Sequence, residues 1–404
     1  MSSSIERVAV IGSGVMGAGI AAHCANAGCE VLLLDIVPKD SEDRSALARG
    51  AIQKMHKSNP EMLMHKRNAK RITAGNIEDD LERLKDFDWV VEVIIENLDI
   101  KRSLYSNISK HIGPNTILSS NTSTLPRSEL VSELPGDIAS RFLITHFFNP
   151  PRYLPLLEVV TAPEVDEAVV ERFCTFADSN LGKRVTMCND RPGFIGNRLG
   201  VYFIQRAFKA TLDHGLSIEQ ADAMLGRPIG LPKTAVFALM DLVGIDLIPH
   251  VTESLLSHLP DGDPFHEIAG TGEEIVMSMI EDGYTGRKGK GGFYRLNREG
   301  GKKVKEARDL SNGEYKTANR RAAFPSAKMG KRGLAPLMDC DDDGSRLVTD
   351  VLLDSLSYAA HIVPDVSDDI YSIDGAMKVG YNLSLIHISE PTRLGMISYA
   401  DVCL

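Results

Sequence analysis

Short apolar runs alternate with longer helical patterns through the first half of the chain. Residues 8–11 and 31–34 are predicted to be strands, and residues 16–27 between them a helix that ends at Gly28. Strand candidates further along are 89–95, 116–118, 142–145, 156–160 and 185–188. Strands separated by helices are typical of βαβ units, so the pattern predicts a parallel sheet.

The pattern becomes helical near residue 190. Residues 194–212 repeat apolar positions at helical spacing, which predicts a long amphipathic helix. Ser217 and Gln220 form a capping-box pattern at the start of a second helix, and residues 233–242 favour a third. We therefore expect the chain to change there from an α/β domain to an all-α domain.

These patterns divide the chain into predicted domains. Residues 1–190 are expected to form the α/β domain and residues 191–296 the helical one. Residues 297–344 are polar, with a basic run followed by an acidic run, and this composition suits a linker. A new helical pattern predicts the start of a second helical domain over 345–382, which the chain is too short to finish.

Composition and charge exclude several classes of protein. The formal net charge of −10 argues against a general nucleic-acid binder, because phosphate binding needs basic surface. No apolar run reaches the length of a membrane span. The six cysteines form no CxxC pair and show no zinc spacing, so we expect no metal site and buried thiols in a reducing, cytoplasmic compartment.

A glycine-rich loop directly follows the first predicted strand. Gly12 permits a tight turn, Gly14 lets the backbone approach a pyrophosphate, and Gly17 allows the next helix to pack closely on the strand. Val15 and Met16 open that helix, whose free N–H groups would meet the phosphates.

An acidic residue, Asp35, ends the second predicted strand. A carboxylate there accepts hydrogen bonds from the adenosine ribose and repels a 2′-phosphate, which favours NAD over NADP as the cofactor. The strand, loop, helix and carboxylate together predict a Rossmann-type NAD-binding domain. The alternative is a glycine-rich turn in a similar fold that binds another nucleotide, or none.

Three later motifs carry a resemblance to a known family. They are Ser119-Ser120-Asn121-Thr122-Ser123, His146-Phe147-Phe148-Asn149-Pro150 and Arg191-Pro192-Gly193-Phe194-Ile195-Gly196-Asn197-Arg198. With the glycine loop, they closely resemble the L-3-hydroxyacyl-CoA dehydrogenases of fatty-acid β-oxidation, over residues 5–295. The resemblance implies an enzyme that uses NAD to oxidise L-3-hydroxyacyl-CoA to 3-oxoacyl-CoA.

The residues suit this chemistry. A histidine side chain titrates near neutral pH, so His146 can take the proton of a secondary alcohol. Glu158 stands in an apolar run, where a carboxylate is costly unless it is paired. The resemblance implies that Glu158 orients His146, and that Ser123 and Asn197 hydrogen-bond the substrate oxygen. Taken singly, these residues would be an ordinary histidine, a turn and an edge-strand glutamate.

The resemblance also implies a set of cofactor contacts. Glu96 and Lys101 would line the NAD site, Ser123 and Asn149 would lie near the nicotinamide, and Lys288 would reach back from the helical domain. For the two lysines the alternative is an ordinary solvated charge.

The substrate and the assembly follow from the same resemblance. The helical domain would supply the acyl pocket and a homodimer surface. The family's usual Gly-Pro-Phe is replaced by Leu231-Pro232-Lys233, which leaves the preferred acyl-chain length open. A basic cluster could contact the CoA phosphates or could be a solvated helical face; it contains Lys54, Lys57, Lys66, Arg67, Lys70 and Arg71.

The last residues do not continue the resemblance. Residues 383–404 resemble a translated sequencing adapter, and we expect them to be an artefact. Two other functions stay open at this point. One is a related dehydrogenase of a free hydroxy acid or sugar acid, and the other is an inactive NAD-binding fragment.

Overall fold

The computed structural model describes residues 4–298, 301–319 and 321–381, and the chain divides into two compact units. The first unit contains residues up to 195 together with 365–368, and the second contains 196–364 and the described residues from 369 onward. In the part of the chain that is described, no helix is both long and apolar enough to cross a lipid bilayer. The expected tail, 383–404, lies outside the described residues.

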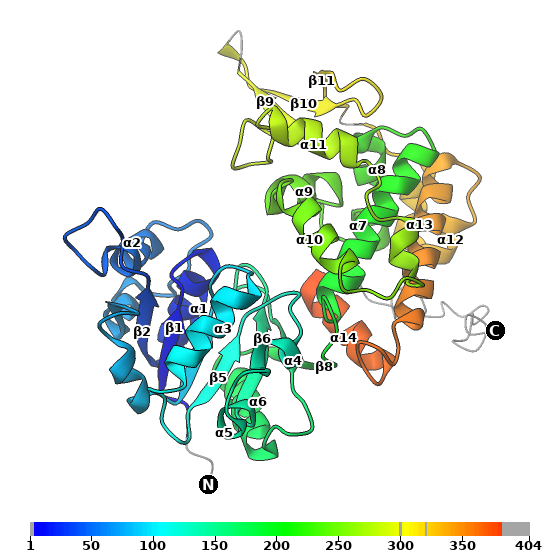
Figure 1. Ribbon diagram of the computed structural model, residues 1–404. Coiled ribbons are helices and arrows are strands. Elements are labelled where there is room, and N and C mark those ends of the chain that lie inside the picture. The colour runs from blue at the N-terminus through cyan, green and yellow to red at the C-terminus, as the bar shows by residue number, and fades with distance from the viewer. Residues whose placement is uncertain (1–3, 299–300, 320, 382–404) are drawn as a thin grey trace. The chain divides into compact units, whose positions relative to one another are not determined.

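The first unit is built on one eight-stranded sheet (Figure 1). Its strands are β1 (Arg7–Ile11), β2 (Glu30–Asp35), β3 (Ile72–Asn76), β4 (Trp89–Glu92), β5 (Ile117–Ser120), β6 (Phe142–Phe147), β7 (Leu156–Val160) and β8 (Arg184–Cys188). They run in the order β3-β2-β1-β4-β5-β6-β7-β8, and all neighbours are parallel except β6 and β7. This is the doubly wound α/β arrangement that the sequence predicts.

Helices surround the sheet at the positions where the chain crosses between strands. They are α1 (Val15–Asn26), α2 (Ala46–Met55), α3 (Leu98–Ile108), α4 (Arg127–Val131), α5 (Gly136–Ala139) and α6 (Glu167–Ser179), with 3₁₀ turns η1 (Lys66–Arg71) and η2 (Leu81–Asp86). The predicted strands and the first helix are confirmed. The edge strand β3 was not predicted, because its sequence Ile-Thr-Ala-Gly-Asn lacks an apolar run.

The period of two along each strand separates the two faces of the sheet. Trp89 of β4 packs with Phe173 and Phe176 of α6 in the main apolar core. Phe142 of β6 instead contacts Tyr105 of α3. Since His146 is four residues after Phe142 on β6, it lies on the face that α3 covers.

The second unit is mostly helical. Its elements are α7 (Gly196–Asp213), α8 (Ile218–Met224), η3 (Arg227–Ile229), α9 (Phe237–Val243), α10 (Leu247–Leu256), η4 (Pro264–Glu267), α11 (Glu273–Glu281), β9 (Tyr294–Asn297), β10 (Val304–Arg308), β11 (Tyr315–Thr317), η6 (Pro325–Arg332), α12 (Leu334–Met338), α13 (Asp343–His361) and α14 (Ile370–Tyr381). The capping box of Ser217 and Gln220 is confirmed. Helix α9 begins later than predicted, because Asp222 accepts hydrogen bonds from Phe237 N–H and its neighbours.

The predicted start of a second helical domain packs directly on α7. Figure 1 shows α13, in orange, alongside α7, in green. The Tyr202 and Tyr358 rings stack with centroids 3.8 Å apart, and the buried Tyr358 hydroxyl bonds both Arg198 and Asp263. The helices α7 and α13 therefore share one core within the second unit.

The described residues of 297–344, which polar composition predicted to be a linker, are folded instead. Strands β9, β10 and β11 form an antiparallel sheet in the order β11-β10-β9. The Arg295 guanidinium lies 3.9 Å from the Tyr315 ring centroid, and the Lys305 ammonium 3.6 Å from that of Tyr294. This small sheet is stabilised by cations that stack on aromatic rings, so its sequence is polar although it is folded. Polar composition alone therefore predicted a linker wrongly.

Two basic side chains of the first unit lie in or beside α1, the half-buried His23 and the buried Lys183. His23 Nε2 donates to the Leu181 carbonyl at 3.0 Å, and its Nδ1 is buried with no hydrogen-bond partner among the described residues. Lys183 donates to the carbonyls of Pro151 and Leu154. Burial, with help from the Lys183 charge, lowers the pKa of His23 to about 4.

This histidine should make the protein less stable in mild acid. An unfolded chain protonates His23 below pH 6.5, whereas the folded chain resists protonation until about pH 4. The unfolded state therefore binds more protons between these values, and stability falls as pH falls. We expect His23→Gln, which keeps a donor but cannot titrate, to remove about 2 kcal/mol of this loss. Urea unfolding at pH 7 and pH 5 measures it, and equal pH slopes for the two proteins would contradict it.

Candidate active site

The carboxyl ends of the parallel strands bring the predicted site residues of the first unit to one edge of the sheet. The Gly12 loop follows β1, Asp35 ends β2, Glu96 follows β4, and Ser123 follows β5. His146 lies near the end of β6. The chain winds outward from β1 in both directions, so the switch point lies between β1 and β4, where such folds bind their ligands.

The glycine loop has the shape that a dinucleotide needs. Gly12 has φ +106°, and a side chain there would collide with the Val93 carbonyl. A side chain at Gly17 would collide with the Gly12 carbonyl, so both positions require glycine for packing. Gly14, the N-cap of α1, faces open space, and no side chain caps this helix. The residues present therefore fit a pyrophosphate at the start of α1.

Asp35, the residue predicted to bind the ribose, is hydrogen-bonded to this loop. The Ser13 N–H and hydroxyl donate to Asp35 Oδ2 at 2.7 and 2.5 Å, and Ile36 N–H donates to Oδ1 at 2.7 Å. Val15, beside the loop, is 65% exposed, while Met16 is half-buried. The role of Ser13 was not predicted, because a serine within GxGxxG carries no signal of its own.

A buried histidine and glutamate face each other across β6 and β7. His146 and Glu158 are direct partners in the antiparallel register. His146 Nδ1 lies 2.7 Å from Glu158 Oε2, and the two side chains are 7% and 0% exposed. A carboxylate can only accept, so Nδ1 carries the proton and Nε2 is the basic nitrogen of the ring.

The second carboxylate oxygen is held by the segment that follows β8. Ile195 N–H donates to Glu158 Oε1 at 3.0 Å. This contact requires a sharp turn in which Gly193 has φ +74° and Phe194 has φ +47°, the latter unusual for a residue with a side chain. The Phe148 and Phe194 rings flank His146 at 4.5 and 5.9 Å between centroids. The imidazole is thus fixed by a hydrogen bond and by packing.

Glu96 organises the loop that carries Ser123. Its Oε1 accepts the Ser123 and Thr124 N–H groups at 3.0 and 3.2 Å, and also the Thr122 hydroxyl. Burial opposes ionisation of Glu96, but the Lys101 ammonium and these hydrogen bonds outweigh it and lower its pKa. The loop is therefore built around a charged carboxylate.

Lys101 is buried beneath this loop. Its ammonium lies 2.7 Å from Glu92 Oε1 and 3.3 Å from Glu96 Oε2. Glu92 is fully buried and also accepts from Tyr105 and Ser120 hydroxyls. Sequence reasoning missed Glu92, although the signal that identified Glu158, a carboxylate in an apolar strand, applies to it equally.

The remaining predicted site residues are Asn149, Asn197 and Lys288. Asn149 is exposed just beyond β6. Asn197, half-buried in the first turn of α7, and Lys288, which is exposed and 2.7 Å from Asp246, belong to the second unit. The described residues contain no group of three or more histidine, cysteine or acidic side chains that could hold a metal ion.

A Rossmann-type sheet with this open helix terminus and a carboxylate at the end of β2 defines the class of NAD-binding dehydrogenase domains. Comparison with known families is more specific. Residues 7–191 match the NAD-binding domain of 3-hydroxyacyl-CoA dehydrogenase, and residues 193–296 match its C-terminal domain. The chain belongs to the 3-hydroxyacyl-CoA dehydrogenase family.

Individual relatives agree with this assignment. A Deinococcus radiodurans protein named as a 3-hydroxyacyl-CoA dehydrogenase is 43% identical over 73% of this chain and 84% of its own length. A Rickettsia felis protein named as a fatty acid oxidation complex trifunctional enzyme is 41% identical over the whole chain, which spans only 58% of that protein. The 3-hydroxybutyryl-CoA dehydrogenase of Escherichia coli shares the fold, with TM-score 0.66 and 23% identity over 94% of this chain and 89% of its own.

The two glycines of the loop should respond differently to added side chains. Gly14→Ala should fold normally, since its φ of −62° suits alanine and the new methyl group faces open space. It should nevertheless weaken NADH binding by about tenfold or more, because the methyl group occupies the pyrophosphate approach. Gly17→Ala should destabilise the fold itself. NADH fluorescence titration and thermal unfolding distinguish these effects, and unchanged affinity in Gly14→Ala would argue against the site.

Proposed function

We propose that this chain catalyses NAD-dependent oxidation of L-3-hydroxyacyl-CoA to 3-oxoacyl-CoA, as a step of fatty-acid β-oxidation. The observation that carries the proposal is the buried His146–Glu158 pair at the carboxyl edge of an NAD-binding sheet. The family match and the names of the relatives support the reaction and the substrate class.

His146 is the general base in this proposal. Its Nε2 accepts the proton of the substrate hydroxyl, and the positive ring that results is stabilised by the adjacent Glu158 carboxylate. NAD held at the glycine loop would supply the acceptor for the hydride that leaves the carbon bearing this hydroxyl. Because Glu158 acts through the imidazole, it is a positioning residue.

Other residues would position the substrate and NAD. Ser123, whose backbone is fixed by Glu96, and Asn197 would hydrogen-bond the substrate oxygen. Gly12, Gly14, Val15, Met16 and Gly17 would surround the pyrophosphate, with Asp35 on the ribose. Asn149 would lie beside the nicotinamide, and Lys288 would contact the cofactor. Lys101 would act through Glu96, because its ammonium is buried against that carboxylate.

In this proposal, the exposed basic cluster in and after α2 would contact the acyl-CoA substrate. The side chains Lys54, Lys57, Lys66, Arg67 and Lys70 are exposed, and their charge is suited to the CoA phosphates.

The assembly and the compartment are proposed on separate grounds. Leu242, Val243 and Leu247 of the second unit are 50%, 55% and 42% exposed, which favours a homodimer through this apolar patch. Light scattering that gives a monomer mass would contradict it.

The free thiols, such as the buried Cys24 and Cys29, suit the reducing cytoplasm.

Replacing the base should abolish most of the activity. We expect His146→Gln to lower turnover of an L-3-hydroxyacyl-CoA by about 10²–10⁴-fold, because the hydroxyl proton then has no acceptor of suitable basicity. NADH absorbance measures the rate, and NADH binding should change little. Wild-type turnover in this variant would refute the role of His146.

The same assay separates the proposal from its alternatives. The wild-type chain should reduce NAD with hydroxyacyl-CoA esters much faster than with the corresponding free hydroxy acids. A preference for the free acids would show a different dehydrogenase. NADH binding without turnover of either class would indicate an inactive NAD-binding fragment.

A further inference from the structure

Two arginines stand at the start of α2, in the segment that follows the ribose carboxylate Asp35. They are Arg44, directly before the helix N-cap Ser45, and Arg49, in its first turns. In folds of this kind that bind NADP, an arginine near the end of the second strand accommodates the 2′-phosphate. The segment therefore holds the kind of group that a 2′-phosphate would need.

Strand pairing places this segment next to the ribose position. Asp35 of β2 is opposite Asn76 of β3, and Ile77 N–H donates to the Asp35 carbonyl at 3.0 Å. Asn76 in turn donates from Nδ2 to the Ser45 hydroxyl at 3.3 Å. The end of β2, the turn after β3 and the start of α2 are thus in direct contact.

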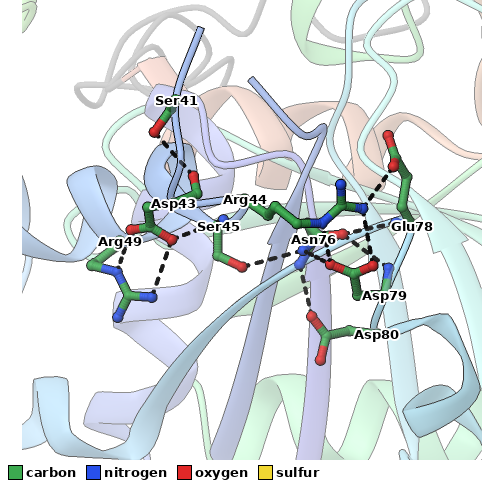
Figure 2. Close-up of polar contacts among 9 residues, drawn as sticks. All are labelled: Ser41, Asp43, Arg44, Ser45, Arg49, Asn76, Glu78, Asp79 and Asp80. Atoms are coloured by element: carbon green, nitrogen blue, oxygen red, sulfur yellow. Dashed lines mark hydrogen bonds and ion pairs between the residues drawn. The ribbon is translucent and has the colours of Figure 1, made fainter. Parts of the chain in front are cut away.

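Arg44 is held by two carboxylates of that turn (Figure 2). Its Nε lies 2.7 Å from Asp79 Oδ2, and its Nη2 lies 2.9 Å from Asp79 Oδ1 and 2.8 Å from Glu78 Oε2. Asp79 is itself fixed by Asn76 Nδ2 at 2.9 Å. The guanidinium therefore donates from two nitrogens to Asp79, and one of these nitrogens also donates to Glu78.

The nearby guanidinium groups of Arg49 and Arg83 are also paired with protein carboxylates. Asp43 accepts from Ser45 N–H at 3.1 Å, and its Oδ2 lies 2.7 Å from Arg49 Nε. Asp80 pairs with Arg83 at 2.9 Å. The carboxylates here already outnumber the guanidinium groups of Arg44, Arg49 and Arg83, and Asp35 adds to the negative charge that a phosphate dianion would meet.

These ion pairs contribute little to stability. The side chains of Arg44, Glu78 and Asp79 are 50%, 58% and 50% exposed. Exposed pairs of this kind are largely compensated by solvent. A role in selecting the cofactor accounts for a forked, three-residue arrangement beside the ribose position better than a role in holding the fold.

We propose that Glu78 and Asp79 are specificity-determining residues that hold Arg44 away from the adenosine ribose and so exclude the 2′-phosphate of NADP. Asp35 alone would disfavour NADP by repulsion. The contacts with Glu78 and Asp79 add a second barrier, because they withhold the Arg44 guanidinium, which could otherwise turn toward the phosphate. The inference rests on the proposed function because it concerns the cofactor site of that function, but its test measures binding and not turnover.

The test removes the two carboxylates that hold Arg44 and leaves Arg44 itself unchanged. In the full chain, Glu78→Gln with Asp79→Asn should shift the ratio of NADPH to NADH affinity toward NADPH by about tenfold or more. Fluorescence titration with each reduced cofactor measures the ratio, and thermal unfolding should change little. Adding Arg44→Gln to this double variant should remove most of the gain.

A matched control carries the same change of charge. Asp40→Asn with Glu42→Gln also removes two negative charges just before Arg44, but it leaves the contacts of Arg44 with Glu78 and Asp79 in place. The proposal is overturned if this control gives the same shift, if Arg44→Gln leaves the gain intact, or if the ratio does not move. Because binding is measured directly, a chain that binds NADH but turns over no substrate refutes the proposed function alone.

Discussion

The pairing of His146 with Glu158 depends on one reversal in an otherwise parallel sheet. Strand β7 runs antiparallel to β6, and this register puts the carboxylate directly opposite the imidazole. A slip of one residue would turn Glu158 to the other face, into the apolar core that holds Leu157 and Val159. The core contacts of Leu157 and Val159 thus help to fix the geometry of a polar pair on the opposite face.

A fully buried carboxylate is tolerated only when its oxygens are used. Glu158 meets this condition with His146 on one oxygen and the Ile195 N–H on the other. Glu92 and Glu96 follow the same rule. Glu92 accepts hydrogen bonds from Lys101 and Tyr105, and Glu96 accepts one from the Ser123 N–H. Side chains and loops at this edge of the sheet are therefore held in place before any ligand arrives, which lowers the cost of ordering them for the reaction.

The sequence predicted the parts of the fold whose signal is local. Apolar runs located β1, β2 and β7, and glycine spacing located the start of α1. Strand β3 and the sheet of β9 to β11 were not predicted, since their stability comes from pairing and from cation–aromatic stacking between distant residues. In the site, a sequence motif predicted His146, and the position of an acidic residue in an apolar run predicted Glu158. The contacts of Ser13, Glu92 and Ile195 depend on turns that only the folded chain brings together.

The role proposed for Glu158, to orient His146 for catalysis, is tested by Glu158→Gln, because the amide keeps the shape of the side chain and removes its charge. The rate of NADH formation in a single turnover, measured by rapid mixing with saturating NAD and hydroxyacyl-CoA, separates hydride transfer from binding and release. The account predicts a rate lowered by about 10²–10⁴-fold, with NADH affinity unchanged. A rate equal to that of the unaltered protein would contradict it.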